Sequence, residues 1–236
     1  MSTAQLVRVP RAWGAGGEPM CEAAMLRLPF DDAATVAEAS LSDQTAAIAR
    51  VLPDRPIVLG GCCGAHVGAV AGLAQRHGRV GVVWFDAHGD LNTPQSSPSG
   101  NQWGMPFRII LDEGHAGVGD SILIGARSLD PSEQAFIAET ALATSIDDLD
   151  RVLEGIGGVY IAFDCDVLDP TEIACFMPEP GGISMDEATA IVARVADGVP
   201  VLGMGLTAFL PDESNVPRLV RRRIGVSERW ARMSAA

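Results

Sequence analysis

The sequence contains no lysine: all 17 basic residues are arginines, and 30 acidic residues outnumber them in a chain of 236. The resulting net charge of −13 makes nucleic acid and anionic membranes poor partners, because both carry charge of the same sign. No apolar run approaches the roughly 18 residues that a membrane-spanning helix needs, and nothing at the N-terminus is typical of a signal peptide. We therefore expect a cytoplasmic protein without a nucleic-acid or membrane partner.

The sequence has only five cysteines, an odd number, and their spacing is not that of a small secreted domain. They are Cys21, Cys62, Cys63, Cys165 and Cys175. We therefore expect free thiols rather than structural disulfides.

Hydrophobic residues make up 47% of the chain, enough for one sizeable core, so we expect a single domain over residues 1–236. Short runs rich in Val and Ile alternate with stretches of helical periodicity, which indicates an α/β fold with a mostly parallel central sheet. The predicted strands are 5–9, 57–60, 81–85, 121–125, 158–163 and 201–206. The predicted helices are 43–52, 65–77, 131–139, 146–154, 185–196 and 216–223.

Two of the predicted strands end in aspartates. Asp86, His88 and Asp90 follow the first in the segment FDAHGD, and Asp164 and Asp166 follow the second in FDCDVLDP. Because an extended backbone points alternate side chains to one face, each set should share one side. Two long polar loops, 91–106 and 168–183, follow the same strands, and in parallel sheets ligands gather outside the carboxyl ends.

Four carboxylates brought together would repel one another unless cations neutralise them, so these residues indicate a metal site. A single D-x-D is equally well explained as a turn or a helix cap, but two such motifs, one including His, favour metal binding. Carboxylates and imidazole suit hard or borderline divalent ions, and the number of carboxylates indicates two of them.

The segments WFDAHGDLNTP, SPSGNQWGMP and FDCDVLDP, the last followed by PEPGGIS, resemble the signatures of the arginase and agmatinase family of ureohydrolases. The resemblance implies an arginase-like three-layer α/β/α fold with two Mn(II) ions, whose bridging hydroxide attacks a guanidinium carbon and releases urea. It also implies that Asp86 and Asp164 bridge the ions. Asp90 would complete one ion's ligands, His88 and Asp166 the other's, and Asp90 would take the proton from the bridging water.

Three departures from the family pattern fall on the chemistry. Cys63, in GGCCG, stands where the family has a metal-ligating histidine; it is either a thiolate ligand, which could draw Zn, Co or Fe instead of Mn, or an inert buried thiol. His66 is a possible substitute ligand or a helix-packing residue. Trp103 stands where family members carry a proton-shuttling histidine, and Ala208 where a glutamate grips the guanidinium.

The resemblance also implies residues that bind the α-amino and α-carboxylate groups of the substrate, as in family members that use arginine. They are Asn92, Ser99 and Asn101 in the first long loop, with Trp103 beside them, and Asp130 and Glu133 in RSLDPSE. Such groups suit a free α-carboxylate and α-ammonium. The alternative explanation is ordinary loop and N-cap chemistry, above all for Asp130 before Pro131.

These features together predict a hydrolase of a small guanidino substrate, an arginine-like amino acid whose guanidine is modified and less basic, such as Nω-hydroxyarginine. A non-catalytic family member that keeps a metal site, and an agmatinase-like or guanidino-acid activity, are the alternatives. A metal-dependent deacetylase ranks last, because such sites use one catalytic metal. The sequence leaves open a homo-oligomer or a monomer.

Overall fold

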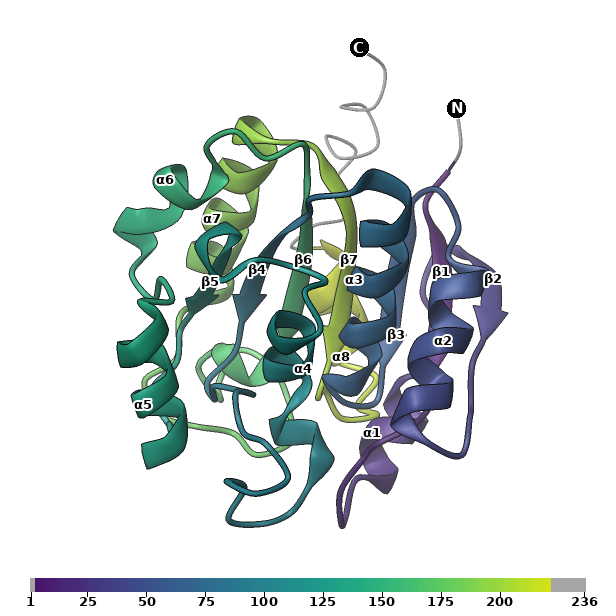
Figure 1. Cartoon of the computed structure of the whole chain (residues 1–236). Helices are drawn as coiled ribbons and strands as arrows, with labels where there is room; N and C mark the ends of the chain where they lie inside the picture. Colours follow the sequence, from purple (N-terminus) through teal and green to yellow (C-terminus); the bar gives the residue numbers. More distant parts are fainter. Residues whose placement is uncertain (1–2, 222–236) are drawn as a thin grey trace.

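The computed structural model describes residues 3–221, which form a seven-stranded sheet in which every pairing is parallel (Figure 1). The strand order is β2-β1-β3-β7-β6-β4-β5. The strands are β1 (Gln5–Val9), β2 (Asp31–Thr35), β3 (Pro56–Gly60), β4 (Gly81–Phe85), β5 (Ser121–Ile124), β6 (Val159–Asp164) and β7 (Val201–Thr207).

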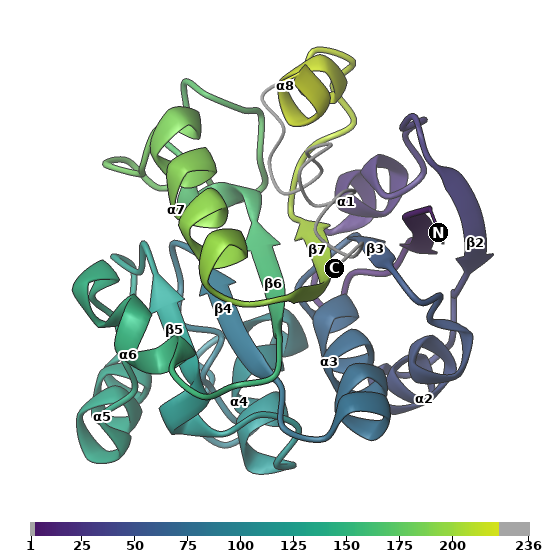
Figure 2. The ribbon, with the colours of Figure 1, turned by 90° about the horizontal axis from the view of Figure 1, so that it is seen from above.

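Helices cover both faces of this sheet, which confirms the three-layer α/β/α fold (Figure 2). One core lies between the sheet and the α2, α3 and α4 side, the other on the α1, α6 and α7 side. The helices are α1 (Glu18–Ala23), α2 (Leu41–Val51), α3 (Gly64–His77), α4 (Pro106–Asp112), α5 (Pro131–Thr140), α6 (Leu149–Leu153), α7 (Met185–Gly198) and α8 (Asn215–Arg221). None of them is long and apolar enough to cross a membrane.

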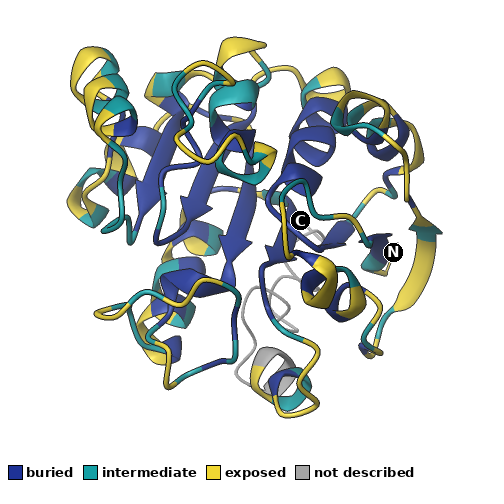
Figure 3. Ribbon diagram, turned by 90° about the horizontal axis from the view of Figure 1, so that it is seen from below, coloured by how far each residue is buried: buried dark blue, intermediate teal, exposed yellow. Residues whose placement is uncertain are grey.

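Strands β3, β4, β5 and β6 are buried along their whole length, which explains why their sequences are continuous apolar runs rather than alternating ones (Figure 3). All six predicted strands are present within one or two residues of their predicted ends. The edge strand β2 was missed: its sequence DDAAT is mostly exposed and contains neither an apolar run nor an aromatic residue.

The helices also follow the prediction with small differences. The sequence did not indicate α1 or α4, which are short and begin beside prolines after irregular segments. The predicted helix 146–154 is a 3₁₀ turn (Ile146–Asp148) followed by α6. The last predicted helix, 216–223, corresponds to α8, and its final two residues lie outside the described part of the chain.

The strand order brings four chemistry-bearing strand ends together. In the middle of the sheet the strands lie in the order β3, β7, β6, β4. The connection from β3 to β4 therefore crosses over the positions of β7 and β6. Parallel strands end at the same edge, and a reversal of strand order leaves a crevice there in which ligands bind. The segments after β3, β4 and β6, which contain the predicted site, therefore meet at one edge.

We expect Gly68→Ala to destabilise the protein although alanine is the better helix former. A Cβ at Gly68 would lie 2.7 Å from both Ile48 Cβ and the backbone oxygen of Thr45 in α2. Overpacking of this kind costs about 1–3 kcal/mol, which exceeds the roughly 1 kcal/mol that alanine gains over glycine in a helix. Urea unfolding measures the change.

Gly119→Ala is the control, because no atom lies within 4 Å of the added Cβ. The packing of α3 on α2 would be wrong as described if Gly68→Ala were as stable as the parent.

Candidate functional site

The candidate site is a buried cluster of acidic and sulfur side chains at the carboxyl edge of the sheet. Cys63 immediately precedes α3 in the short connection after β3, Asp86 directly follows β4, and Asp164 is the last residue of β6. Asp166 lies in a 3₁₀ turn (Cys165–Val167) immediately after β6. These four residues and Asp90 are each at most 6% exposed.

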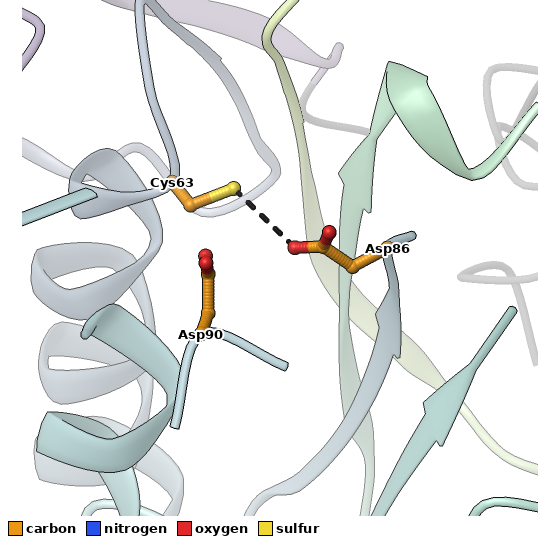
Figure 4. Close-up of side chains that lie close together, drawn as sticks. All are labelled: Cys63, Asp86 and Asp90. Carbon is orange, nitrogen blue, oxygen red and sulfur yellow. Dashed lines mark hydrogen bonds between the residues drawn. The ribbon is translucent and has the colours of Figure 1, made fainter. Parts of the chain in front are cut away.

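Two triplets of ligand-type atoms lie within this cluster and share one residue. The atoms of Cys63, Asp86 and Asp90 lie within 4.8 Å of one another, as do those of Asp86, His88 and Asp166. In Figure 4 the Cys63 sulfur and the Asp86 and Asp90 carboxylates point toward one common space. Asp86 therefore stands between two positions that could each hold a cation.

Hydrogen bonds to both carboxylate oxygens hold the Asp86 side chain in a single orientation. The backbone N–H of His88 donates to Asp86 Oδ1 at 2.7 Å, and the indole Nε1 of Trp84 donates to Asp86 Oδ2 at 3.0 Å. These contacts leave Asp86 little freedom to turn away from the shared space.

Asp166 and Asp164 are held in the same way. The Ala87 backbone N–H donates to Asp166 Oδ1 at 2.9 Å, and His88 Nδ1 lies 2.9 Å from Asp166 Oδ2. Asp164 Oδ1 accepts the Asp166 backbone N–H at 3.0 Å, while its Oδ2 lies 2.9 Å from the Cys63 sulfur.

The electrostatics of the cluster favour a bound cation. Burial, followed by repulsion from neighbouring aspartates, raises the pKa values of Asp90 and Asp164 well above the usual range. The same causes raise the pKa of Asp166 to about 6. Burial alone would lower the pKa of His88, but hydrogen bonds to Asp166 and Asp86 outweigh it and raise the pKa to about 12. In the metal-free protein, bound protons neutralise the negative charge of these aspartates. Divalent cations would neutralise it more effectively.

An unpaired oxygen supports the same interpretation. Among the described residues, Asp90 Oδ2 is buried and has no hydrogen-bond partner, which is costly unless another group binds it. Carboxylates and imidazole are ligands that Mn(II) accepts, and a thiolate suits Zn(II), Co(II) or Fe(II). The donor set therefore fits a pair of divalent ions.

The predicted reason for the convergence of Asp86, His88 and Asp90 was wrong. They were expected to alternate along an extended backbone, but β4 ends at Phe85, and Asp90 adopts a left-handed conformation with φ of 52°. A turn, rather than a strand, brings the three side chains together. Asp166 likewise belongs to a 3₁₀ turn and not to the strand.

The cluster forms the floor of a cavity of about 280 Å³. Among the predicted substrate residues, Asn92, Ser99, Trp103, Asp130 and Glu133 line this cavity. Asn101 is not among the lining residues, and its amide oxygen accepts a hydrogen bond from the Ala15 backbone at 3.3 Å.

Three of these polar residues form a preorganised rim. Asn92 Nδ2 donates to Asp130 Oδ2 at 2.8 Å. Glu133 accepts from the backbone N–H groups of Leu91 and Asp130, at 3.0 and 2.9 Å, and makes a capping box with Asp130 at the start of α5. Asp130 thus also has the N-cap role that was the alternative explanation, and Glu133 is committed to backbone partners.

Another part of the cavity wall is apolar, and the sequence did not indicate most of it. Trp103 meets Phe176 edge to face at 5.4 Å between ring centroids and packs against the backbone of Gly14, where a Cβ would collide with the indole. Ala208 completes a small cluster with Met20 and Cys62. This wall unites five segments far apart in the chain, so no local motif could reveal it.

Two charged residues from different loops beside the cavity, Glu179 and Arg127, were also missed. Glu179 lines the cavity, and its Oε1 lies 3.8 Å from His88 Nε2. Arg127 donates to the backbone oxygens of Asp166 and Glu179 at 2.7 and 2.9 Å, so it ties this loop to the end of β6. The only sequence signal for Glu179 was its place in PEPGG.

His66 does not point into the cavity. Its Nδ1 lies 3.0 Å from the Tyr160 hydroxyl and its Nε2 lies 3.3 Å from Thr207 Oγ1, so both ring nitrogens are occupied. Burial lowers its pKa to about 3, which keeps the ring neutral. This geometry supports a packing role rather than that of a substitute ligand.

Comparison with known proteins places the chain. A sequence model of the arginase family matches residues 17–216, and the chain belongs to this family. An arginase of Bacillus subtilis (strain 168) is 36% identical over 168 residues, which cover 60% of this chain and 57% of that protein. An arginase of Staphylococcus aureus (strain COL) is 37% identical over 142 residues, 50% of this chain and 47% of that protein. The chain thus spans about half the length of these curated relatives.

Solved structures share the fold. A crystal structure of Bacillus subtilis arginase superposes with a TM-score of 0.78 at 24% identity and covers 96% of this chain and 99% of that chain. Proclavaminate amidino hydrolase from Streptomyces clavuligerus superposes with a TM-score of 0.76 at 19% identity, over 99% and 92% of the two chains.

In the presence of a chelator, we expect the free energy of unfolding to fall as pH rises from about 4 to about 6. The folded chain keeps protons on Asp90, Asp164 and Asp166 that the unfolded chain releases near its ordinary aspartate pKa of about 3.9, so rising pH favours unfolding. His88, with its raised pKa, acts in the same direction above about pH 6.5. Added Mn(II) should remove this dependence and raise the melting temperature.

Thermal melts with chelator and with Mn(II) across this pH range test the expectation. Asp90→Asn is the matched control and should reduce the pH dependence. Chelated protein that becomes more stable between about pH 4 and pH 6 would contradict the buried, mutually repelling cluster.

Proposed function

We propose that the protein is a binuclear-metal hydrolase of the ureohydrolase type, which acts on the guanidino carbon of an arginine-like amino acid with a modified, less basic guanidine. Nω-hydroxyarginine is the specific candidate, and hydrolysis would give ornithine and hydroxyurea. The observation that carries the proposal is the division of one cavity into a carboxylate floor and an apolar wall of Ala208, Trp103 and Phe176.

Cys63, Asp86, Asp90 and Asp164 would hold one divalent ion, and Asp86, His88, Asp164 and Asp166 the other. Two Mn(II) ions match the carboxylates, whereas Cys63 could draw Zn, Co or Fe to its side of the site. When bound, such ions polarise the substrate and lower the pKa of water, so that hydroxide is available near neutral pH.

Asp90 is suited to accept the proton of the attacking water. It is buried at the cavity floor, and one of its oxygens has no protein partner among the described residues. Its position therefore allows it to hold the proton during cleavage.

Two residues of the rim, Asn92 and Asp130, and the lining residue Ser99 are suited to the amino-acid end of the substrate. Asp130 and Asn92 already hydrogen-bond to each other, so a carboxylate and an amide face the cavity in a fixed arrangement. A substrate α-ammonium would pair with Asp130, and an α-carboxylate would accept from Asn92 or Ser99.

The apolar wall argues against an ordinary guanidinium. Ala208 cannot pair with a cation, and the indole of Trp103 cannot exchange a proton near neutrality. Burying a full positive charge against this wall would leave it unpaired on that side, which is costly. A hydroxyguanidine is less basic, so it can lie against this wall as a neutral group and loses less by doing so.

Incubation of the Mn(II)-loaded protein with Nω-hydroxyarginine and with arginine in parallel tests the proposal. We expect ornithine from hydroxyarginine at least about ten times faster than from arginine, equivalent to about 1.4 kcal/mol in the barrier. Asp90→Asn serves as the inactive control. Equal rates, or activity on arginine alone, would contradict the substrate assignment, and no hydrolysis of either would favour a non-catalytic metal-binding protein.

Ala208→Glu should shift the preference toward arginine by about tenfold or more in the ratio of kcat/KM values, because a carboxylate at this wall pairs with a guanidinium. The residue has φ of 58°, and alanine already carries the Cβ, so the substitution adds no new backbone constraint. Ala208→Gln, of equal size and without charge, should leave the ratio near its starting value. If both variants changed the ratio equally, size rather than charge would set the specificity.

A further inference from the structure

Three buried polar side chains behind Cys63 form a chain of hydrogen bonds that leads to its sulfur. Tyr160 belongs to β6, Thr207 is the last residue of β7, and His66 lies one helical turn after Cys63 in α3. All three are fully buried. None of them lines the cavity, so none can contact substrate.

The distances connect these residues without a gap. The Tyr160 hydroxyl lies 3.0 Å from His66 Nδ1, and His66 Nε2 lies 3.3 Å from Thr207 Oγ1. Thr207 Oγ1 in turn lies 3.2 Å from the Cys63 sulfur and 3.3 Å from Asp164 Oδ2. This series of hydrogen bonds therefore ends at Cys63 and Asp164, two residues of the candidate metal centre.

In this series of hydrogen bonds, each group donates to the next one in the direction of the metal site. Among the described residues, His66 is the only hydrogen-bond partner of the Tyr160 hydroxyl, so a buried O–H donor is satisfied only if Nδ1 accepts from it. A neutral imidazole then carries its proton on Nε2 and donates to Thr207. The hydroxyl hydrogen of Thr207 remains free to donate to the Cys63 sulfur or to Asp164 Oδ2.

The surroundings are shaped to accommodate this arrangement. Gly205 leaves room for it: a Cβ there would lie 2.6 Å from the His66 ring and would collide with the Tyr160 hydroxyl. The His66 ring also meets Trp84 edge to face at 5.2 Å, and Trp84 Nε1 donates to Asp86 Oδ2. His66 thus supports Cys63 through Thr207 and Asp86 through Trp84.

We infer that Thr207, held by His66 and Tyr160, is a positioning residue that orients the Cys63 sulfur toward the metal ion beside Asp86 and Asp90. The inference rests on the proposed function in one respect, the use of Cys63 as a ligand. Groups that hydrogen-bond to metal ligands fix their direction, and their loss lowers metal affinity about 10- to 100-fold. The competing explanation is that the three side chains only satisfy one another in the core.

Titration of the metal-free protein with Co(II) separates these explanations, because a thiolate bound to cobalt gives a charge-transfer absorption that carboxylates do not give. We expect this absorption in the parent protein and not in Cys63→Ser. Thr207→Val should shift or weaken it and lower the Co(II) affinity of the sulfur-containing position about 10- to 100-fold. Thr207→Ser, which keeps the hydroxyl, should restore both.

Tyr160→Phe removes only the first hydroxyl of the chain and provides a second test if Thr207→Val does not fold. It should change the cobalt absorption in the same direction by a smaller amount. Absorption and affinity that are unchanged in Thr207→Val, or in Tyr160→Phe when Thr207→Val does not fold, would overturn the inference. So would absorption that persists in Cys63→Ser.

This outcome is distinguishable from failure of the proposed function, which is measured by ornithine release. A protein that hydrolyses neither guanidine, yet shows the expected cobalt changes, would refute the proposed activity and support the role of Thr207. Hydrolysis of hydroxyarginine by the parent protein, with a cobalt spectrum unchanged in Thr207→Val, would support the proposed activity and refute the role of Thr207.

Discussion

Repulsion among buried carboxylates is the constraint on which the rest of the site depends. Asp86, Asp90, Asp164 and Asp166 are all buried at one edge of the sheet, and their charges oppose one another across a few ångströms. A fold keeps such a cluster only if something compensates it. The backbone N–H groups and the Trp84 indole stabilise individual oxygens, but they leave Asp90 Oδ2 unpaired within the described structure.

The strand order is what makes this concentration of charge possible. Placing β3, β7, β6 and β4 side by side brings their carboxyl ends to one crevice, so that short segments after each strand can contribute ligands without long excursions. The wall of Trp103 and Phe176, by contrast, comes from the long loops, which are free to vary while the sheet stays the same. The site therefore combines an acidic floor at the strand ends with an apolar wall supplied largely by the loops.

Local pattern was enough to predict the buried strands and the aspartates that follow them. It was not enough for β2, whose polar sequence forms a strand only because β1 offers it a partner. Nor could it reveal that Trp103 rests on Gly14, or that Glu179 lies near His88, since these contacts join segments about ninety residues apart. The hydrogen bonds that join His66, Tyr160 and Thr207 could not be predicted either, because they link residues far apart in the sequence. Each of these residues alone is common in a helix or strand.

The central claim is that two cations share Asp86 in this cluster, and anomalous scattering from crystals of the Mn(II)-loaded protein tests it most directly. We expect two peaks per chain, one beside Cys63, Asp86 and Asp90 and the other beside Asp86, His88 and Asp166. The Cys63 sulfur should lie at a bonding distance, slightly more than the roughly 2.3 Å of a zinc–thiolate bond. A single peak, or a sulfur turned away from both ions, would contradict it.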